Sequence, residues 1–170
     1  MAEKDGELTG GCACGAVRYR LDRGPIMVHN CYCTLCQQQT GSTSVVNLFV
    51  ETDALIQLSG ATVRHKVRTG SGGEQVIVRC AECGVALWSH YPRLGELGAG
   101  VRVGTLDNPG AVAPDVAIFT AERMPWVALP EGIPQFEKSY VFTEVLAPDR
   151  IARLDALAAK RAAQLAQRDA

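Results

Sequence analysis

The stretch Cys31-Tyr32-Cys33-Thr34-Leu35-Cys36 carries three thiols within six residues. Two cysteine pairs flank it, Cys12-Ala13-Cys14 upstream and Cys80-Ala81-Glu82-Cys83 downstream, and the three clusters together contain all seven cysteines of the chain. A structural zinc ion takes four ligands in a closed tetrahedron, whereas a reactive zinc ion keeps three protein ligands and one open position. Seven thiols therefore predict two zinc ions per chain, one in a closed site and one in an open site.

The two flanking pairs, Cys12 with Cys14 and Cys80 with Cys83, are the expected ligands of the closed site. Each pair lies on an expected turn, and a glycine directly follows its second thiol. Glycine accepts the positive φ that a tight turn around the thiols needs. A closed zinc site contributes about 10–16 kcal/mol at neutral pH, so we expect the loss of one thiolate to unfold this region. The alternative is that the pairs are ordinary buried cysteines.

The central cluster of Cys31, Cys33 and Cys36 is the candidate for the open site. Zinc held there by three thiolates would deprotonate an entering thiol or polarise a carbonyl oxygen. The alternative is a second structural zinc ion whose fourth ligand is a histidine. The chain offers three candidates for that ligand: His29, His65 and His90.

Composition excludes several classes of function. The 170 residues include 17 basic and 18 acidic side chains, and no basic stripe predicts a nucleic-acid partner. No apolar run approaches the about 20 residues of a membrane helix, and the charged N-terminus predicts no signal peptide. We therefore expect a cytoplasmic protein in which reduced cysteines bind metal. A secreted, disulfide-bonded domain is the alternative.

Hydrophobic residues alternate with polar ones over much of the chain, which is the period of a half-buried strand. The expected strands cover residues 17–21, 25–29, 45–50, 55–58, 63–67, 75–79, 85–91, 101–106, 116–119 and 139–146. The glycine-rich stretch Gly70-Ser71-Gly72-Gly73 predicts a hairpin connection. Residues 37–41 predict a helical turn that ends at Gly41.

The segment that begins at Pro148 differs from the rest of the chain. Proline is favoured in the first turn of a helix, and apolar residues then recur at helical spacing. These apolar residues are Ile151, Leu154, Leu157 and Leu165. We expect an amphipathic C-terminal helix that docks on the β core or is partly exposed, and a homodimer contact is the alternative.

Several motifs match one known family: Gly10-Gly11-Cys12-Ala13-Cys14-Gly15-Ala16-Val17-Arg18-Tyr19, the Cys31-x-Cys33-x-x-Cys36 run with Gly41, Cys80-x-x-Cys83-Gly84, Gly104-Thr105-Leu106-Asp107-Asn108-Pro109, and the pairs Pro125-Trp126 and Leu129-Pro130. On these residues the sequence resembles the glutathione-dependent formaldehyde-activating enzyme family, which is grouped with centromere protein V. The resemblance covers roughly residues 8 to 139. It rests mainly on the order and spacing of all seven cysteines.

This resemblance implies a mostly β fold in which two antiparallel sheets meet over zinc in a tent-like arrangement. Residues 8–146 would form the zinc-binding domain, and residues 147–170 would form the C-terminal helix. The resemblance assigns a structural zinc ion to Cys12, Cys14, Cys80 and Cys83 and a catalytic zinc ion to Cys31, Cys33 and Cys36. Both assignments agree with the division of the thiols into four and three.

The expected function is that of a carbon–sulfur lyase. Its substrate would be the adduct of a thiol such as glutathione and a small aldehyde such as formaldehyde, because the reaction of the family joins these two as S-hydroxymethylglutathione. The alternative is a non-enzymatic zinc-binding domain with a structural or protein-interaction role. A fourth protein ligand at the central cluster would favour this alternative.

Overall fold

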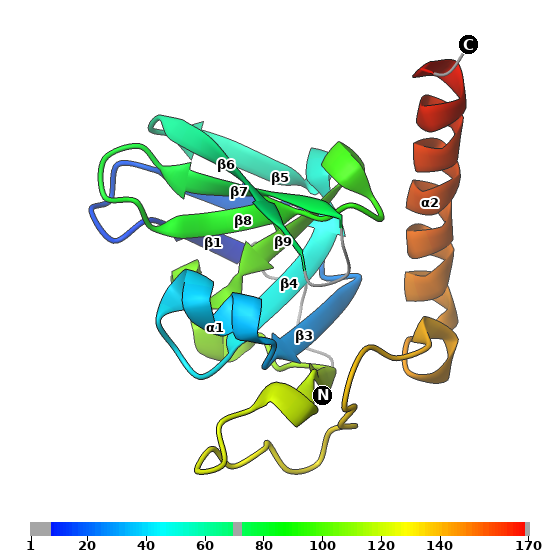
Figure 1. Cartoon of the computed structure of the whole chain (residues 1–170). Helices are drawn as coiled ribbons and strands as arrows, with labels where there is room; N and C mark the ends of the chain where they lie inside the picture. Colours follow the sequence, from blue (N-terminus) through cyan, green and yellow to red (C-terminus); the bar gives the residue numbers. More distant parts are fainter. Residues whose placement is uncertain (1–7, 70–72, 169–170) are drawn as a thin grey trace.

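The computed structural model describes residues 8–69 and 73–168, which form two β-sheets and two α-helices (Figure 1). The smaller sheet has the strand order β1-β2-β5 and contains β1 (Leu8–Gly11), β2 (Arg18–Leu21) and β5 (Leu55–Ser59). The larger sheet has the order β10-β3-β4-β9-β8-β7-β6. Its strands are β3 (Met27–Cys31), β4 (Val45–Glu51), β6 (Thr62–Arg68), β7 (Glu74–Cys80), β8 (Ala86–His90), β9 (Gly98–Arg102) and β10 (Val116–Ile118). The mostly β fold with two sheets is therefore confirmed.

Strand pairing is antiparallel except at one edge of the larger sheet. There β10 runs parallel to β3, and Ile118 lies opposite Cys31. A parallel neighbour requires a long crossover connection, which here is the whole chain between β3 and β10. This pairing brings a distant segment beside the central cysteine cluster.

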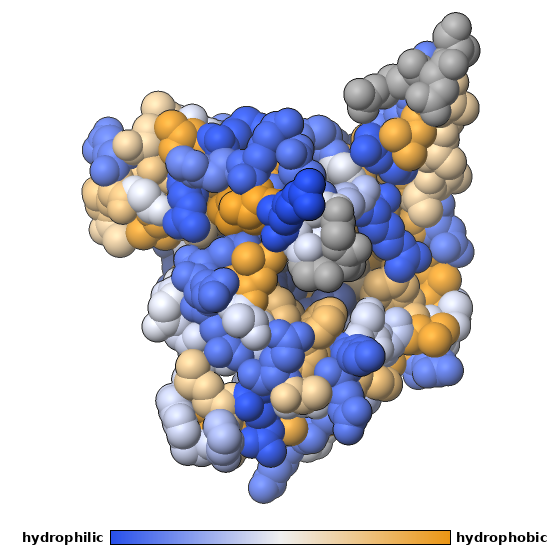
Figure 2. Space-filling view, in the orientation of Figure 1, coloured by the Kyte–Doolittle hydropathy of each residue, from blue (hydrophilic) through white to orange (hydrophobic). Residues whose placement is uncertain are grey.

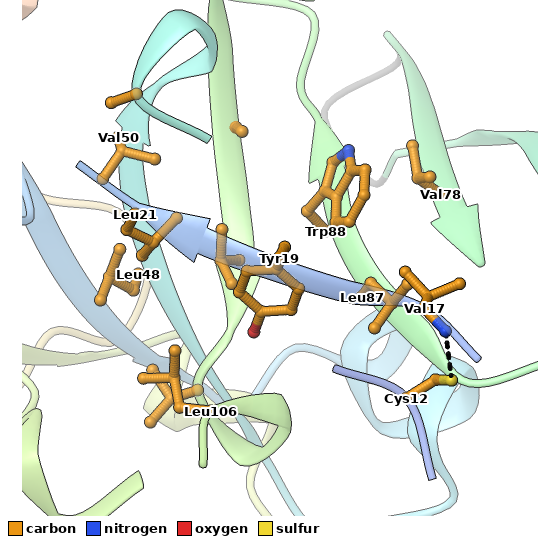
Figure 3. Packing of buried hydrophobic residues seen from close by; sticks show 14 of the residues in the cluster. Cys12, Val17, Tyr19, Leu21, Leu48, Val50, Val78, Leu87, Trp88 and Leu106 are labelled. Atoms are coloured by element: carbon orange, nitrogen blue, oxygen red, sulfur yellow. Dashed lines mark hydrogen bonds between the residues drawn. The ribbon is translucent and has the colours of Figure 1, made fainter. Parts of the chain in front are cut away.

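The main hydrophobic core fills the space between the two sheets (Figure 3). Tyr19 and Leu21 of β2 point toward Leu48 of β4 and Trp88 of β8. The rings of Tyr19 and Trp88 meet edge to face with centroids 6.0 Å apart, a geometry that aromatic pairs prefer. Alternating side chains of both sheets thus build one core, as expected for half-buried strands.

The other face of the larger sheet is covered by helices and loops. Helix α1 (Thr34–Thr40) lies over one end, and helix α2 (Pro148–Arg168) packs over another part (Figure 1). The docking of α2 rests on Leu154 and Leu157, which are 2% and 5% exposed. The C-terminal part of α2 extends beyond the sheets (Figure 1), and its residues 162–167 are exposed. Figure 2 shows that this side of the molecule is mainly hydrophilic, with hydrophobic residues in separate patches.

An ion pair fixes the first turn of α2 to the larger sheet. Arg150 donates two hydrogen bonds to the Asp115 carboxylate, at 2.9 and 2.7 Å, and a third to the carbonyl of Ile26 at 2.6 Å. Asp115 also accepts the backbone N–H of Val28 at 2.7 Å. Two-pronged pairs between arginine and a carboxylate combine energy with geometric specificity, so this contact sets where α2 begins to cross the sheet.

The structure corrects four details of the sequence interpretation. Residues 139–146 form no strand but contain the 3₁₀ turn Phe142–Glu144, because the N–H groups of Val145 and Leu146 donate to the carbonyl of Phe142 rather than to a neighbouring strand. Strand β1 precedes the first cysteine pair, where only a turn was expected. Strand β9 ends at Arg102 rather than at Leu106. Leu165, expected on the apolar face of α2, is 43% exposed.

The hairpin connection at 70–73 falls mainly on residues 70–72, which lie outside the described residues, although its flanking strands β6 and β7 do pair. Within the described part of the chain, no helix has the length and apolarity needed to cross a membrane.

We predict that the docking of α2 depends on the buried leucine and not on the exposed one. Leu154→Ala should lower the free energy of unfolding by about 2–5 kcal/mol, because it leaves a cavity in a packed core. Leu165→Ala, the same substitution on the same helix, should change it by less than about 0.5 kcal/mol. Urea denaturation followed by circular dichroism measures both values. Equal effects of the two substitutions would contradict the docking of α2 through Leu154.

Candidate metal centres

Four cysteines from two distant hairpins converge at the first cluster. The Sγ atoms of Cys12, Cys14, Cys80 and Cys83 all lie within 4.8 Å of one another. The Sγ atom of Cys14 lies 3.4 Å from that of Cys12 and 3.8 Å from that of Cys80. A zinc–sulfur bond of about 2.3 Å in a tetrahedron places two sulfurs about 3.8 Å apart. The four thiols therefore have the chemistry and the spacing of a closed tetrahedral site.

Each half of this cluster is a tight turn closed by backbone hydrogen bonds. The first begins at Cys12, directly after the end of β1, and the N–H of Val17 donates to the Cys12 sulfur at 3.2 Å (Figure 3). The second follows the end of β7 at Cys80. Gly15 and Gly84 close the two turns with φ of 80° and 74°, a conformation that a residue with a Cβ adopts only at a cost. A backbone hydrogen bond from Val85 lowers the pKa of the Cys83 thiol, which favours the thiolate form.

The second cluster forms where β3 passes into α1. The Sγ atoms of Cys31, Cys33 and Cys36 lie within 4.8 Å of one another. Cys31 is the last residue of β3, Cys33 is the N-cap of α1, and Cys36 lies in its first turn, so that its N–H donates to the Cys33 sulfur at 3.4 Å. All seven cysteines of the chain are free thiols, so the alternative of a disulfide-bonded domain receives no support.

Access to the central cluster is uneven. Cys31 and Cys36 are each 6% exposed, whereas Cys33 is half-buried. Hydrogen bonds from the neighbouring Cys31 and Cys36 thiols lower the pKa of Cys33 to about 3. The lowered pKa favours the thiolate form at Cys33, the cysteine of this cluster that solvent reaches.

Contacts from a distant segment hold the turn of α1 in place. Glu122 accepts the backbone N–H of Thr34 at 2.6 Å and its hydroxyl at 2.8 Å. Gln37 donates to the carbonyl of Tyr32 at 2.6 Å and to that of Glu122 at 3.0 Å. Glu122 follows Phe119, the single non-glycine residue with positive φ (55°) among the described residues. Strained backbone of this kind persists only where its surroundings enforce it, and here it directs the chain toward α1.

The three histidines do not complete the central cluster. Among the described residues, the group of metal-ligand side chains at this position contains the three cysteines and no fourth member. His29 points instead into an aromatic cluster, where its Nε2 lies 2.8 Å from the Tyr140 hydroxyl, and burial lowers its pKa to about 4. His90 Nδ1 lies 3.0 Å from the carbonyl of Gly98, and His65 is exposed on β6.

A row of buried polar residues crosses the sheet next to the central cluster. Register places His29 opposite Asn47 and Asn47 opposite Arg102, and directly opposed residues share a face of the sheet. Cys31 lies two residues after His29 on the same strand, so it is on that face as well. Burial raises the pKa of the Tyr91 phenol, and the charge of Arg102 offsets part of this rise. The polar row and the thiols therefore share one electrostatic environment.

Arg102 is the last residue of this row and is 4% exposed. Its guanidinium donates to the side-chain oxygens of Asn47, Gln39 (2.8 Å) and Ser89 (3.4 Å). A cleft of about 720 Å³ opens beside it, between the end of α1 and the turn that carries Cys83. Cys33 does not line this cleft.

Sequence reasoning missed the residues that support the clusters. Glu122, Gln37 and Tyr140 bear no recognisable motif, since their roles arise from long-range packing. In the sequence, Arg102 is only a basic residue inside a predicted strand. Charged side chains are rarely fully buried, so an arginine that faces inward is itself a sign of a special role. By contrast, Arg64 on β6 pairs with Glu96 on the surface.

The chain is similar to two known proteins, one compared by sequence and one by structure. A protein of Halomonas elongata, provisionally named a glutathione-dependent formaldehyde-activating enzyme, is 35% identical over 97 residues, which is 53% of this chain. The matched part spans 60% of the length of that relative. A crystal structure of a Rhodobacter sphaeroides protein is 19% identical with a TM-score of 0.44, over 75% of this chain and 98% of the other.

The family comparison is broader. A sequence model of the family described as "Glutathione-dependent formaldehyde-activating enzyme" matches residues 7–122, which is more than half of the 170 residues and includes both cysteine clusters. The chain belongs to the glutathione-dependent formaldehyde-activating enzyme family.

Proposed function

We propose that this protein is a zinc-dependent carbon–sulfur lyase that acts on the adduct of a glutathione-like thiol and formaldehyde or a similar small aldehyde. Cys12, Cys14, Cys80 and Cys83 would hold a structural zinc ion. The central cysteines Cys31, Cys33 and Cys36 would hold a catalytic one. Membership of the family supports the substrate pair.

One observation carries the proposal of an active centre. The central cluster brings three thiols together without a fourth ligand among the described residues, and solvent reaches it at Cys33. Zinc with three protein ligands keeps a position for substrate, whereas structural zinc is closed by four. The two clusters differ in this respect although both consist of cysteine alone.

The reaction itself requires little beyond thiolate supply and positioning. The sulfur of the thiol forms a bond to the carbonyl carbon of the aldehyde, and the thiol proton ends on the former carbonyl oxygen. The reverse reaction breaks the same carbon–sulfur bond, and neither direction consumes an oxidant or a reductant. Zinc, when bound, would lower the pKa of a thiol and polarise a carbonyl oxygen.

The protein's own groups would fix the geometry of this step. Glu122 and Gln37 hold the first turn of α1, and with it Cys33 and Cys36. Tyr140 packs against the buried side of the cluster, which leaves the Cys33 side for the substrate. Holding the two reactants in one orientation is itself a large part of such catalysis.

The non-enzymatic alternative remains a competing function because the cleft is not lined by Cys33. In that case the central zinc ion would be inert toward thiols and aldehydes. The two functions therefore predict a different stability of the central site and a different reactivity of its zinc ion toward thiols and aldehydes.

We predict that the two clusters respond differently to the loss of one thiol. Elemental analysis should find two zinc ions per wild-type chain and one in Cys33→Ser, whose circular dichroism should stay that of the wild type. Cys80→Ser, the matched substitution in the other cluster, should abolish the cooperative unfolding transition, because a structural zinc ion contributes about 10–16 kcal/mol. A Cys33→Ser protein that is unfolded, or that retains two zinc ions, would contradict an open central site.

We also predict catalysis of adduct formation. The zinc-loaded wild type should accelerate the interconversion of S-hydroxymethylglutathione with free glutathione and formaldehyde. With Cys33→Ser, the rate should fall to that measured without protein. Exchange spectroscopy by nuclear magnetic resonance measures this rate at equilibrium, in both directions. Leu165→Ala, far from either cluster on the exposed end of α2, is the control and should keep the wild-type rate. An unaccelerated exchange in the wild type would refute the proposed reaction.

A further inference from the structure

The cleft beside Arg102 has two arginines in its lining. Its lining contains Arg79 and Arg102 and no aspartate or glutamate among the described residues. The two arginines differ in position, because Arg102 is 4% exposed whereas Arg79 is half-buried and donates to the carbonyl of Gly84 at 3.0 Å. The cleft therefore combines a deep positive charge with a second one nearer to solvent.

Arg102 is a buried cation whose side-chain acceptors are neutral. Within residues 8–69 and 73–168, no carboxylate forms an ion pair with it, and its hydrogen bonds go to two amide oxygens and a hydroxyl. The other arginines that support the larger sheet, Arg150 and Arg153, each have a carboxylate partner. The charge of Arg102 acts on the nearby Cys36 thiol and offsets some of the rise in its pKa, but no carboxylate in the described part of the chain pairs with the guanidinium. Burying a charge without a paired and hydrogen-bonded opposite charge is costly, so a site with this feature favours an anionic ligand.

The unsatisfied groups around Arg102 are donors. Arg102 Nε is buried and has no acceptor among the described residues. Gln39 links it to a second such group: Gln39 Oε1 accepts from Arg102, Gln39 Nε2 donates to Gln75 Oε1 at 3.2 Å, and Gln75 Nε2 has no acceptor. Buried polar groups in native proteins nearly always have partners. A carboxylate, which only accepts hydrogen bonds when ionised, provides both the acceptors and the opposite charge.

We propose that Arg102 is the anion-binding residue of this cleft and takes a carboxylate of the thiol substrate, with Asn47, Ser89 and Gln39 holding its guanidinium in place. The inference rests on the proposed function, and it adds the residue that would bind a carboxylate of the thiol and the cleft in which that group would lie. Arg79 lies where it adds a weaker attraction near the entrance.

The distance between this subsite and the thiol cluster suits such a molecule. Gln39 follows Cys36 by three residues in α1, which is a rise of about 4.5 Å along the helix. An extended chain of three residues spans about 10 Å. A tripeptide-sized thiol can thus reach from Arg102 to the central cysteines, and the polar row that holds Arg102 lies next to the row of Cys31.

The test compares S-methylglutathione with its diethyl ester, using isothermal titration calorimetry on the zinc-loaded full chain. S-methylglutathione keeps both carboxylates but has no thiol, so it probes the cleft independently of the reaction. We expect the ester to bind the wild type at least about tenfold more weakly, since hydrogen bonds to charged groups contribute about 1.5–3 kcal/mol. This comparison needs no substitution in the protein.

Variants then assign the effect to Arg102. In Arg102→Gln the acid should bind about as weakly as the ester, and Arg102→Lys should restore part of the difference because it restores the charge without the planar fork. Arg64→Gln, which removes an exposed and ion-paired arginine outside the cleft, should behave as the wild type. Thermal unfolding verifies that each variant is folded.

The outcomes separate this inference from the proposed function. Equal binding of acid and ester to the wild type, no binding of S-methylglutathione, or an undiminished difference in a folded Arg102→Gln variant would each overturn the role of Arg102. A wild type that binds as expected but does not accelerate the glutathione–formaldehyde exchange would keep the anion subsite and refute only the proposed reaction.

Discussion

The convergence of four thiols from two hairpins is the contact on which the arrangement of the sheets depends. Cys12 directly follows the first strand of the smaller sheet, and Cys80 ends β7 of the larger sheet, yet the Sγ atoms of the two turns lie within 4.8 Å of one another. Because apolar contacts are not directional, the hydrophobic core fixes only the distance between two packed sheets. Four ligands around one metal ion would also fix the relative orientation of the two sheets. They would do so at the end of the sheets where residues of β7 and β8 line the cleft.

The larger sheet shows how one scaffold supports both packing and chemistry. Its inner face is apolar and meets the smaller sheet, with Leu48 and Trp88 at the centre. Its outer face carries the row of His29, Asn47 and Arg102 between two apolar patches. A polar row of this kind is expensive unless its hydrogen bonds are nearly complete. Its position beside the thiols argues that the polar row serves the site rather than the stability of the fold.

The sequence predicted the fold and the grouping of the thiols because both are encoded locally. Alternating residues reveal most strands, and a C-x-C or C-x-x-C pair with a following glycine reveals a metal-binding turn even though its partner pair is 66 residues away. The failures share a cause as well. Residues 139–146 alternate like a strand, but Tyr140 is drawn inward by His29, a partner 111 residues earlier. Glu122 and Arg102 act through equally distant contacts, which no local pattern records.

The open character of the central cluster follows from the way in which it is built. Its three thiols come from a single strand-to-helix junction, so they approach a common point from one side. A fourth ligand would have to come from the elements that face this junction, and these present Val45, Val116 and the ring of Tyr140. The two valines have no ligand atom, and the Tyr140 hydroxyl lies 2.8 Å from His29 Nε2. The closed cluster has the opposite construction, because its two pairs approach from separate sheets and surround the point between them. The difference in the origin of the thiols, rather than in their chemistry, would thus leave room for a substrate at one cluster and not at the other, as we propose.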